Sequence, residues 1–145
     1  CRDSSRTPVQ WSADKYAGFS EAEPWFALNP NYTAVNVASE EADPNSLLNF
    51  YRAALKLRKE TPAAIWGDYR AYYRASGKLY VYVREHEGVK LLVICSFTEK
   101  AVRFRAPGGI ALGGRTPALC NYPDAPISGN GYTTRPYETR VYVIP

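Results

Sequence analysis

The hydrophobic positions divide the chain into three stretches with different periodicity. Residues 1–42 show little periodicity and are rich in Pro, Asn, Ser and aromatic residues, which is typical of irregular structure. Residues 43–61 repeat apolar side chains at three- and four-residue spacing, and residues 65–145 contain short apolar runs separated by Gly and Pro. The pattern therefore predicts an irregular region, one helix and a set of strands, in that order.

The expected helix at 43–61 has signals at both ends. Asp43 can accept hydrogen bonds from the N–H groups of a first turn, Pro44 suits the first helical position, and Pro62 ends the pattern. The width of the apolar stripe predicts packing against more than one neighbour. The stripe consists of Leu47, Leu48, Tyr51, Ala54 and Leu55, widened by Phe50 and Leu57.

Four later runs predict antiparallel strands. Residues 79–83 follow a Ser-Gly turn signal, and residues 91–95 are continuously apolar, as in a central strand buried on both faces. Residues 102–105 alternate apolar side chains with Arg, which predicts one buried and one solvated face, and residues 140–144 form a final strand. Short strands at this spacing predict a small sandwich or Greek-key domain that begins near residue 67.

Composition narrows the class of protein. A length of 145 residues suits one ordinary domain, or a small domain with a piece of another. The net charge is +4, but the basic residues are scattered, which disfavours nucleic-acid binding, and no apolar run is long enough to span a membrane. The three cysteines show no paired spacing and Cys95 lies in an apolar run, so we expect buried free thiols, a reducing compartment and a cytoplasmic location. Because the chain begins at Cys1 and contains no Met, we expect a processed or excised fragment.

The residues with catalytic chemistry favour structural roles. His86 lies before a Gly in a hairpin-turn context, without partners for a triad or a metal site. The Gly pairs at 108–109 and 113–114 lack the Lys-Ser/Thr of a phosphate loop and predict a β connection. The acidic pairs Glu21/Glu23 and Glu40/Glu41 lie in polar surroundings that would not raise a carboxyl pKa, so we expect solvated charges. No catalytic residue, metal ligand or cofactor site is expected in this chain.

The most specific pattern lies at residues 2–11, Arg-Asp-Ser-Ser-Arg-Thr-Pro-Val-Gln-Trp. It is followed by Ala-Gly-Phe at 17–19, Asn-Pro-Asn-Tyr at 29–32 and Asn-Val at 36–37. This series resembles a segment of the oligo-1,6-glucosidases, dextran glucosidases, trehalose-6-phosphate hydrolases and sucrose isomerases of glycoside hydrolase family thirteen, in the α-amylase superfamily. Val9 stands where that family usually has Met. The resemblance continues at 43–46, 57–60, 67–69 and 136–142, and so covers nearly the whole chain.

The resemblance implies a mainly β fold. Residues 67–145 would form the antiparallel β-sandwich that is the C-terminal domain of this superfamily. Residues 1–66 would be the tail of the catalytic (β/α)8 barrel, with an irregular active-site loop and one amphipathic helix. The expected partner is therefore the rest of that barrel. For these residues as an isolated chain, we expect the first 65 to be poorly ordered or to self-associate.

The resemblance also implies a function. The family hydrolyses terminal α-glucosidic bonds of short oligosaccharides with retention of configuration, and its three catalytic carboxylates lie upstream of this segment. We therefore expect the chain alone to be inactive. Arg2 matches the family arginine that hydrogen-bonds the substrate glucose, and Asp3 would orient it. Arg6, Gln10 and Trp11 would knit the loop to the barrel.

Two alternatives remain open at this point. The Tyr-rich sandwich could be a carbohydrate-binding module with exposed rings at Tyr72, Tyr73 and Tyr132. The chain could also belong to a non-catalytic relative of the glucosidases, which an upstream sequence without the catalytic carboxylates would reveal.

Overall fold

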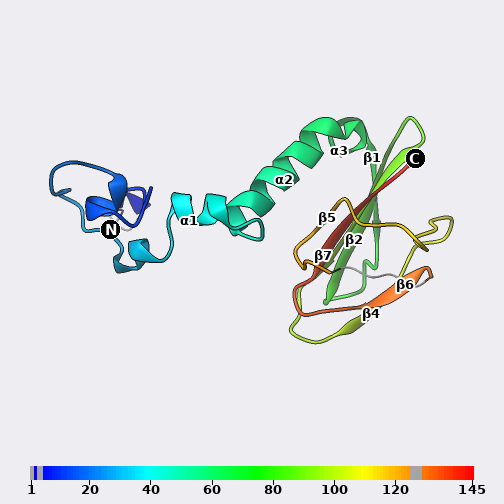
Figure 1. Ribbon diagram of the computed structural model, residues 1–145. Coiled ribbons are helices and arrows are strands. Elements are labelled where there is room, and N and C mark those ends of the chain that lie inside the picture. The colour runs from blue at the N-terminus through cyan, green and yellow to red at the C-terminus, as the bar shows by residue number, and fades with distance from the viewer. Residues whose placement is uncertain (1, 3–4, 125–128) are drawn as a thin grey trace. The chain divides into compact units, whose positions relative to one another are not determined.

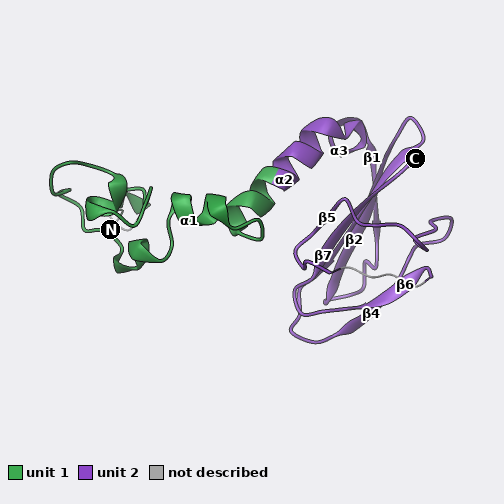
Figure 2. Cartoon of the chain, in the orientation of Figure 1, with its two compact units in different colours: residues 1–52 green, residues 53–145 purple. Residues whose placement is uncertain are grey.

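The computed structural model describes residues 2, 5–124 and 129–145, and the chain forms two compact units, residues 1–52 and 53–145 (Figure 2). The first unit contains two 3-10 helices, η2 (Lys15–Gly18) and η3 (Pro30–Thr33), and the short helix α1 (Val37–Ala42). Helix α2 (Leu47–Glu60) begins in the first unit and ends in the second, where α3 (Pro62–Trp66) follows it. Within the described ranges, none of the helices combines the length and the apolar character that a membrane crossing demands.

The helical region differs from the single helix expected at 43–61. Asp43 follows the last residue of α1 instead of starting the next helix. Helix α2 begins four residues later, at Leu47, because the Ser46 hydroxyl accepts a hydrogen bond from the Asn49 backbone N–H at 3.1 Å and so caps the first turn. Pro62 interrupts the pattern as predicted, but it also begins α3, since its missing N–H costs nothing at the first helical position.

The apolar stripe of α2 is not covered within the described structure. Leu47, Tyr51 and Leu55 are 70%, 63% and 60% exposed, and no residue of α2 is fully buried. Leu57 packs partly against the sheet that follows. The expected packing against several neighbours is therefore limited to the C-terminal end of the helix.

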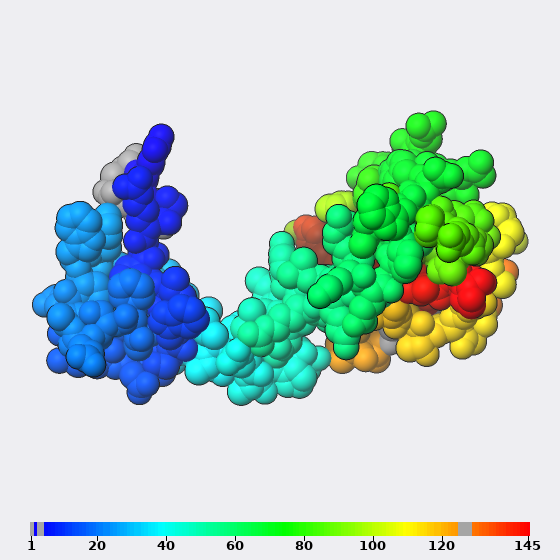
Figure 3. All heavy atoms as spheres, turned by 90° about the horizontal axis from the view of Figure 1, so that it is seen from above, coloured from blue at the N-terminus to red at the C-terminus, as the bar shows by residue number. Residues whose placement is uncertain are grey.

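The second unit contains two antiparallel sheets, so the predicted class of a helical region followed by antiparallel β structure is confirmed (Figure 1). A five-stranded sheet has the order β1-β2-β3-β7-β5, and β4 pairs with β6 in a separate two-stranded sheet. Figure 3 shows residues 68–145 packed as a continuous body. The strands are β1 (Asp68–Tyr72), β2 (Leu79–His86), β3 (Val89–Ser96), β4 (Val102–Arg105), β5 (Leu119–Cys120), β6 (Gly131–Thr134) and β7 (Thr139–Ile144).

Both faces of the five-stranded sheet carry a hydrophobic cluster, which explains the continuous apolar run at 91–95. On one face, Leu92 and Ile94 pack with Phe104 of β4. On the other face, Leu91 and Val93 pack with residues that include two alanines of α3. Strand β3 lies between β2 and β7, so the predicted central strand buried on both faces is confirmed.

Candidate functional site

The N-terminal segment is held together by hydrogen bonds between residues far apart in sequence. The Gln10 side-chain amide donates to the Asn31 side-chain oxygen at 3.2 Å and to the Val35 carbonyl. Two further bonds join the Gln10 and Trp11 carbonyls to the backbone N–H groups of Val37 and Ala38, at 2.9 and 3.0 Å. Gln10 therefore organises its own segment, which the expectation of a role toward the barrel did not include.

A run of three residues in the left-handed backbone region makes the sharp turn after Trp11. Tyr16, Ala17 and Gly18 have φ of 56°, 58° and 63°. The Ala17 carbonyl accepts from the backbone N–H groups of Trp11 and Ser12, at 2.9 and 3.1 Å. A Cβ on Gly18 would lie 2.6 Å from the Ser12 hydroxyl, so glycine is required there on two grounds.

Asn36 connects the segment to α1. Its side-chain oxygen accepts from the Ser39 N–H at 2.9 Å while the Ser39 hydroxyl accepts from the Asn36 N–H at 3.2 Å, a reciprocal capping box. Its amide also donates to the Tyr32 carbonyl at 2.9 Å. The Asn-Pro-Asn-Tyr and Asn-Val parts of the sequence pattern thus serve the internal structure of the loop.

Arg2 lies at the start of this segment and is exposed. Its carbonyl accepts from the Ser5 N–H at 3.2 Å and from the Ser5 hydroxyl at 2.8 Å, so the backbone turns directly after it. Arg6 and Trp11 are also exposed. Asp3, expected beside Arg2, lies outside the described residues, and so does Cys1.

The other candidates occupy structural positions. His86 ends β2 next to the Glu87-Gly88 turn, where φ is 49° and 83°, as predicted. Glu41 pairs with Arg52 at 2.7 Å, and Glu40 accepts from the Leu48 N–H at 3.1 Å, so neither is simply a solvated charge. Cys95 is a free, half-buried thiol whose pKa is raised by burial.

The tyrosines proposed for glycan binding are not exposed, and that prediction was wrong. Tyr72, Tyr73 and Tyr132 are half-buried and pack against the core cluster that contains Phe104. The Tyr73 hydroxyl donates to the Arg105 carbonyl at 2.8 Å, which fixes the ring to β4. The cause is the two-stranded β4–β6 sheet, whose position over these rings could not be deduced from local alternation.

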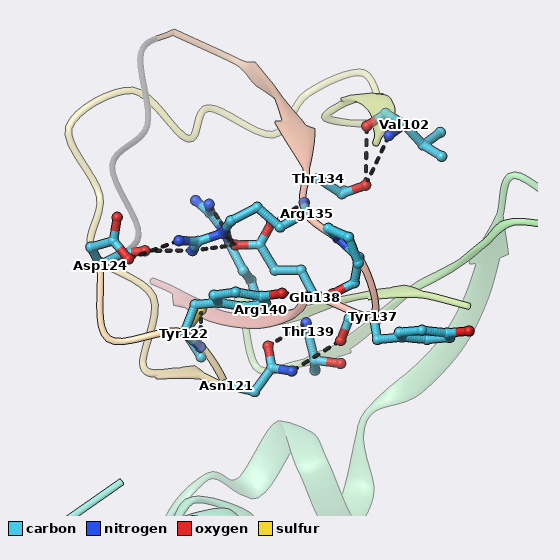
Figure 4. A network of polar contacts seen from close by, with 12 residues as sticks. Val102, Asn121, Tyr122, Asp124, Thr134, Arg135, Tyr137, Glu138, Thr139 and Arg140 are labelled. Atoms are coloured by element: carbon cyan, nitrogen blue, oxygen red, sulfur yellow. Dashed lines mark hydrogen bonds and ion pairs between the residues drawn. The ribbon is translucent and has the colours of Figure 1, made fainter. Parts of the chain in front are cut away.

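A network of charges at the start of β7 was not anticipated from the sequence (Figure 4). The Glu138 side chain is 0% exposed and its carboxylate contacts both Arg135 and Arg140 at 2.8 Å. Arg135 reaches outward to Asp124 at 2.7 Å, and its backbone N–H donates to Glu138 at 2.8 Å. A charge at the inward-facing positions 138 and 140, beside the apolar strand 141–144, is the only sequence signal of this network.

The network holds its members in their charged forms. Burial alone would raise the pKa of Glu138, but the hydrogen bonds from Arg135 and Arg140 outweigh it, so the pKa lies below its usual value. Hydrogen bonding to Arg135 likewise lowers the pKa of Asp124. Over the described residues, no three or more His, Cys, Asp or Glu side chains are grouped so as to hold a metal ion.

Comparisons with known proteins agree with the segment pattern and with the fold. The model of the alpha amylase catalytic domain matches residues 1–67. The oligo-1,6-glucosidase of Halalkalibacterium halodurans is 37% identical over 145 residues, which is 98% of this chain and 26% of that protein. The alpha-glucosidase of Candida albicans is also 37% identical, over 99% of this chain and 24% of its own length. The chain is a relative of the glycoside hydrolase family 13 enzymes.

Solved structures of that family contain the same arrangement of elements in their C-terminal part. Trehalulose synthase MutB from Pseudomonas mesoacidophila matches with a TM-score of 0.85 and 35% identity, over 98% of this chain and 26% of that chain. Trehalose-6-phosphate hydrolase from Bacillus licheniformis matches with a TM-score of 0.84 and 36% identity, over 98% and 26%. The chain thus spans about a quarter of the length of these relatives.

Proposed function

We propose that this chain is the C-terminal part of a family 13 α-glucosidase of the oligo-1,6-glucosidase type. In the longer polypeptide, the enzyme hydrolyses terminal α-glucosidic bonds of short oligosaccharides by the retaining mechanism, with its catalytic carboxylates supplied from outside these residues. The observation that carries the proposal is the 37% identity to an oligo-1,6-glucosidase over 98% of the chain. The free thiols Cys95 and Cys120 favour a reducing compartment, the bacterial cytoplasm.

The proposed domains divide at residues 66 and 67. Residues 1–66 would complete the catalytic barrel, and residues 67–145 would form the C-terminal sandwich. The match of residues 1–67 to a catalytic domain supports this division. So do the exposed apolar side chains of α2 and of Trp66, which is 72% exposed, because they provide a surface for the rest of the barrel to cover.

The sugar contact is assigned to Arg2, with Asp3 as its positioning residue. A guanidinium presents several donors in a rigid fork, which suits two neighbouring hydroxyls of one glucose. The exposure of Arg2 and the turn that Ser5 stabilises directly after it favour a side chain that projects from the segment. Arg6 belongs to the same segment but has no assigned sugar contact.

The first test is the absence of activity in the 145-residue chain. Purified chain incubated with isomaltose, maltose or p-nitrophenyl α-glucoside should release no glucose or nitrophenol above a buffer control. The full-length polypeptide should release both. Turnover by the short chain alone would overturn the proposal.

The second test concerns Arg2 in the full-length polypeptide. Arg2→Lys keeps the charge but loses the paired donors, so kcat/KM should fall by roughly 10- to 100-fold, as expected for loss of a charged hydrogen bond. Arg6→Lys is the matched control, because it makes the same change at an exposed arginine of the same segment, and it should change kcat/KM less than about threefold. Equal effects of the two variants would remove Arg2 from the sugar site.

A further inference from the structure

A cleft of about 720 Å³ lies on the second unit, at the margin of the two-stranded sheet. Its walls come from β4, from β6, and from residues on either side of the turn that enters β7. Four arginines line it, with Asp124 as the acidic residue among its lining residues that the structure describes. These arginines are Arg103, Arg105, Arg135 and Arg140.

The charge of this arginine cleft is positive after its ion pairs are counted. Glu138 contacts Arg135 and Arg140, and Asp124 contacts Arg135. Four guanidinium groups against these two carboxylates leave a net charge of +2. The two carboxylates both have lowered pKa values, so the balance holds at neutral pH.

One wall of the arginine cleft comes from β4. Arg103 and Arg105 are two residues apart on one strand, so they share the face opposite to the buried Phe104, and both are exposed. Their partners across the sheet are Thr133 and Gly131, which are small. Glycine is required at 131, because a Cβ there would lie 2.6 Å from the Phe104 carbonyl oxygen, and its lack of a side chain leaves room beside Arg105.

The other wall of the arginine cleft is rigid. Glu138, without exposed side-chain surface, holds Arg135 and Arg140 at 2.8 Å each. The Arg140 guanidinium lies 3.9 Å above the centre of the Tyr132 ring, which limits its rotation. The positions of these two arginines are therefore set before any ligand arrives, which lowers the entropy cost of binding.

We propose that the arginine cleft binds a small phosphomonoester. Guanidinium groups match phosphate oxygens in geometry, and a phosphomonoester carries about −1.5 to −2 charges at pH 7, close to the +2 of the cleft. A nucleic-acid polymer fits less well, because it needs a basic stripe longer than this single cleft. The site lies on β4, β6 and β7, and does not depend on the N-terminal segment or on the proposed glucosidase activity.

Calorimetry with the 145-residue chain tests this proposal, with glucose 6-phosphate and inorganic phosphate as probes and glucose as the uncharged control. Both phosphates should bind with a millimolar or tighter Kd that weakens as NaCl is raised, whereas glucose should not bind. In Arg103→Ala/Arg105→Ala the Kd of both phosphates should rise at least about tenfold, because charged hydrogen bonds are lost. Circular dichroism should show an unchanged fold, since both side chains are exposed.

Arg74→Ala is the matched control, because it removes an exposed arginine that does not line the arginine cleft. It should leave the Kd unchanged within about twofold. The proposal is overturned by three results: no binding of either phosphate, an equal loss in Arg74→Ala and the double variant, or tighter binding of a 20-nucleotide single strand than of glucose 6-phosphate. The last result would assign the arginines to a nucleic-acid surface.

Discussion

Glu138→Gln should strongly destabilise the β unit, because it removes the one negative charge that is buried between two arginines. The substitution keeps the size of the side chain, but it leaves the Arg140 side chain, 4% exposed, without its buried counter-charge at 2.8 Å. Breaking a buried ion pair by removing one partner costs about 3–5 kcal/mol. A domain of this size loses about 4–8 °C in Tm per kcal/mol, so the midpoint should fall by about 12 °C or more.

Asp124→Asn is the matched control, because it takes a carboxylate from the same Arg135 at a position where the side chain is 74% exposed. Exposed pairs contribute about 0–1 kcal/mol, so this variant should unfold close to the parent chain. Urea and thermal unfolding, followed by the β signal in circular dichroism, measure both variants. The reasoning is refuted if the free energies of unfolding of the two variants differ by less than about 1 kcal/mol, which would mean that burial adds nothing to the pair.

Three further predictions follow from the same unit. Because the folded-state pKa of Glu138 is lowered, the stability it adds is present above pH 4.5, the ordinary value, and is lost as pH falls through the folded pKa; acid titration of unfolding should show a steeper loss below pH 4.5 in the parent than in Glu138→Gln. Ile94→Ala, at 0% exposure on β3, should cost about 2–5 kcal/mol in urea unfolding, whereas Leu55→Ala, at 60% exposure on α2, should cost less than about 1 kcal/mol; equal costs would contradict the assignment of the core. Gly131→Ala should cost about 1–3 kcal/mol, because its Cβ would meet the Phe104 carbonyl at 2.6 Å, whereas Gly108→Ala has nothing within 4 Å and should be neutral within about 1 kcal/mol; thermal denaturation of the pair distinguishes them.

The strand region was predictable because its signals are local. The continuous apolar run of β3 and the alternation of Arg103 and Arg105 with Phe104 depend only on which faces are buried, and the structure confirms both. The start of α2 was not predictable in the same way. Asp43 and Ser46 both offer a capping oxygen, and the choice of Ser46 goes with a second bond from its hydroxyl to the Glu40 carbonyl at 2.6 Å, which joins residues six apart.

The charge network escaped prediction for a related reason. Asp124 and Arg135 are eleven residues apart and meet only because the chain turns back between β5 and β7. A charged residue in a strand pattern ordinarily signals a solvated face, so Glu138 and Arg140 gave no local sign that each would be buried by the other. Tyr132 was misassigned as exposed because the same loops place it under Arg140.

The two units obtain their order from different sources, and this difference predicts how each will behave in solution. In residues 53–145, two hydrophobic clusters and a buried ion pair offset the loss of conformational entropy. Among the described residues of 1–52, the buried apolar side chains are Pro8 and Ala17, and the remaining order comes from hydrogen bonds that water can replace.

Burial of so little apolar surface cannot offset the cost of ordering some fifty residues, at about 1–2 kcal/mol each, so the first unit needs contacts with polypeptide outside the chain. In hydrogen exchange of the 145-residue chain, backbone amides of residues 5–46 should therefore exchange close to the unprotected rate while those of β3 exchange slowly. In the full-length polypeptide both should be slow. Protection of residues 5–46 in a monomeric short chain, with monomer mass verified by light scattering, would mean that local hydrogen bonds suffice and that the apolar stripe of α2 needs no cover.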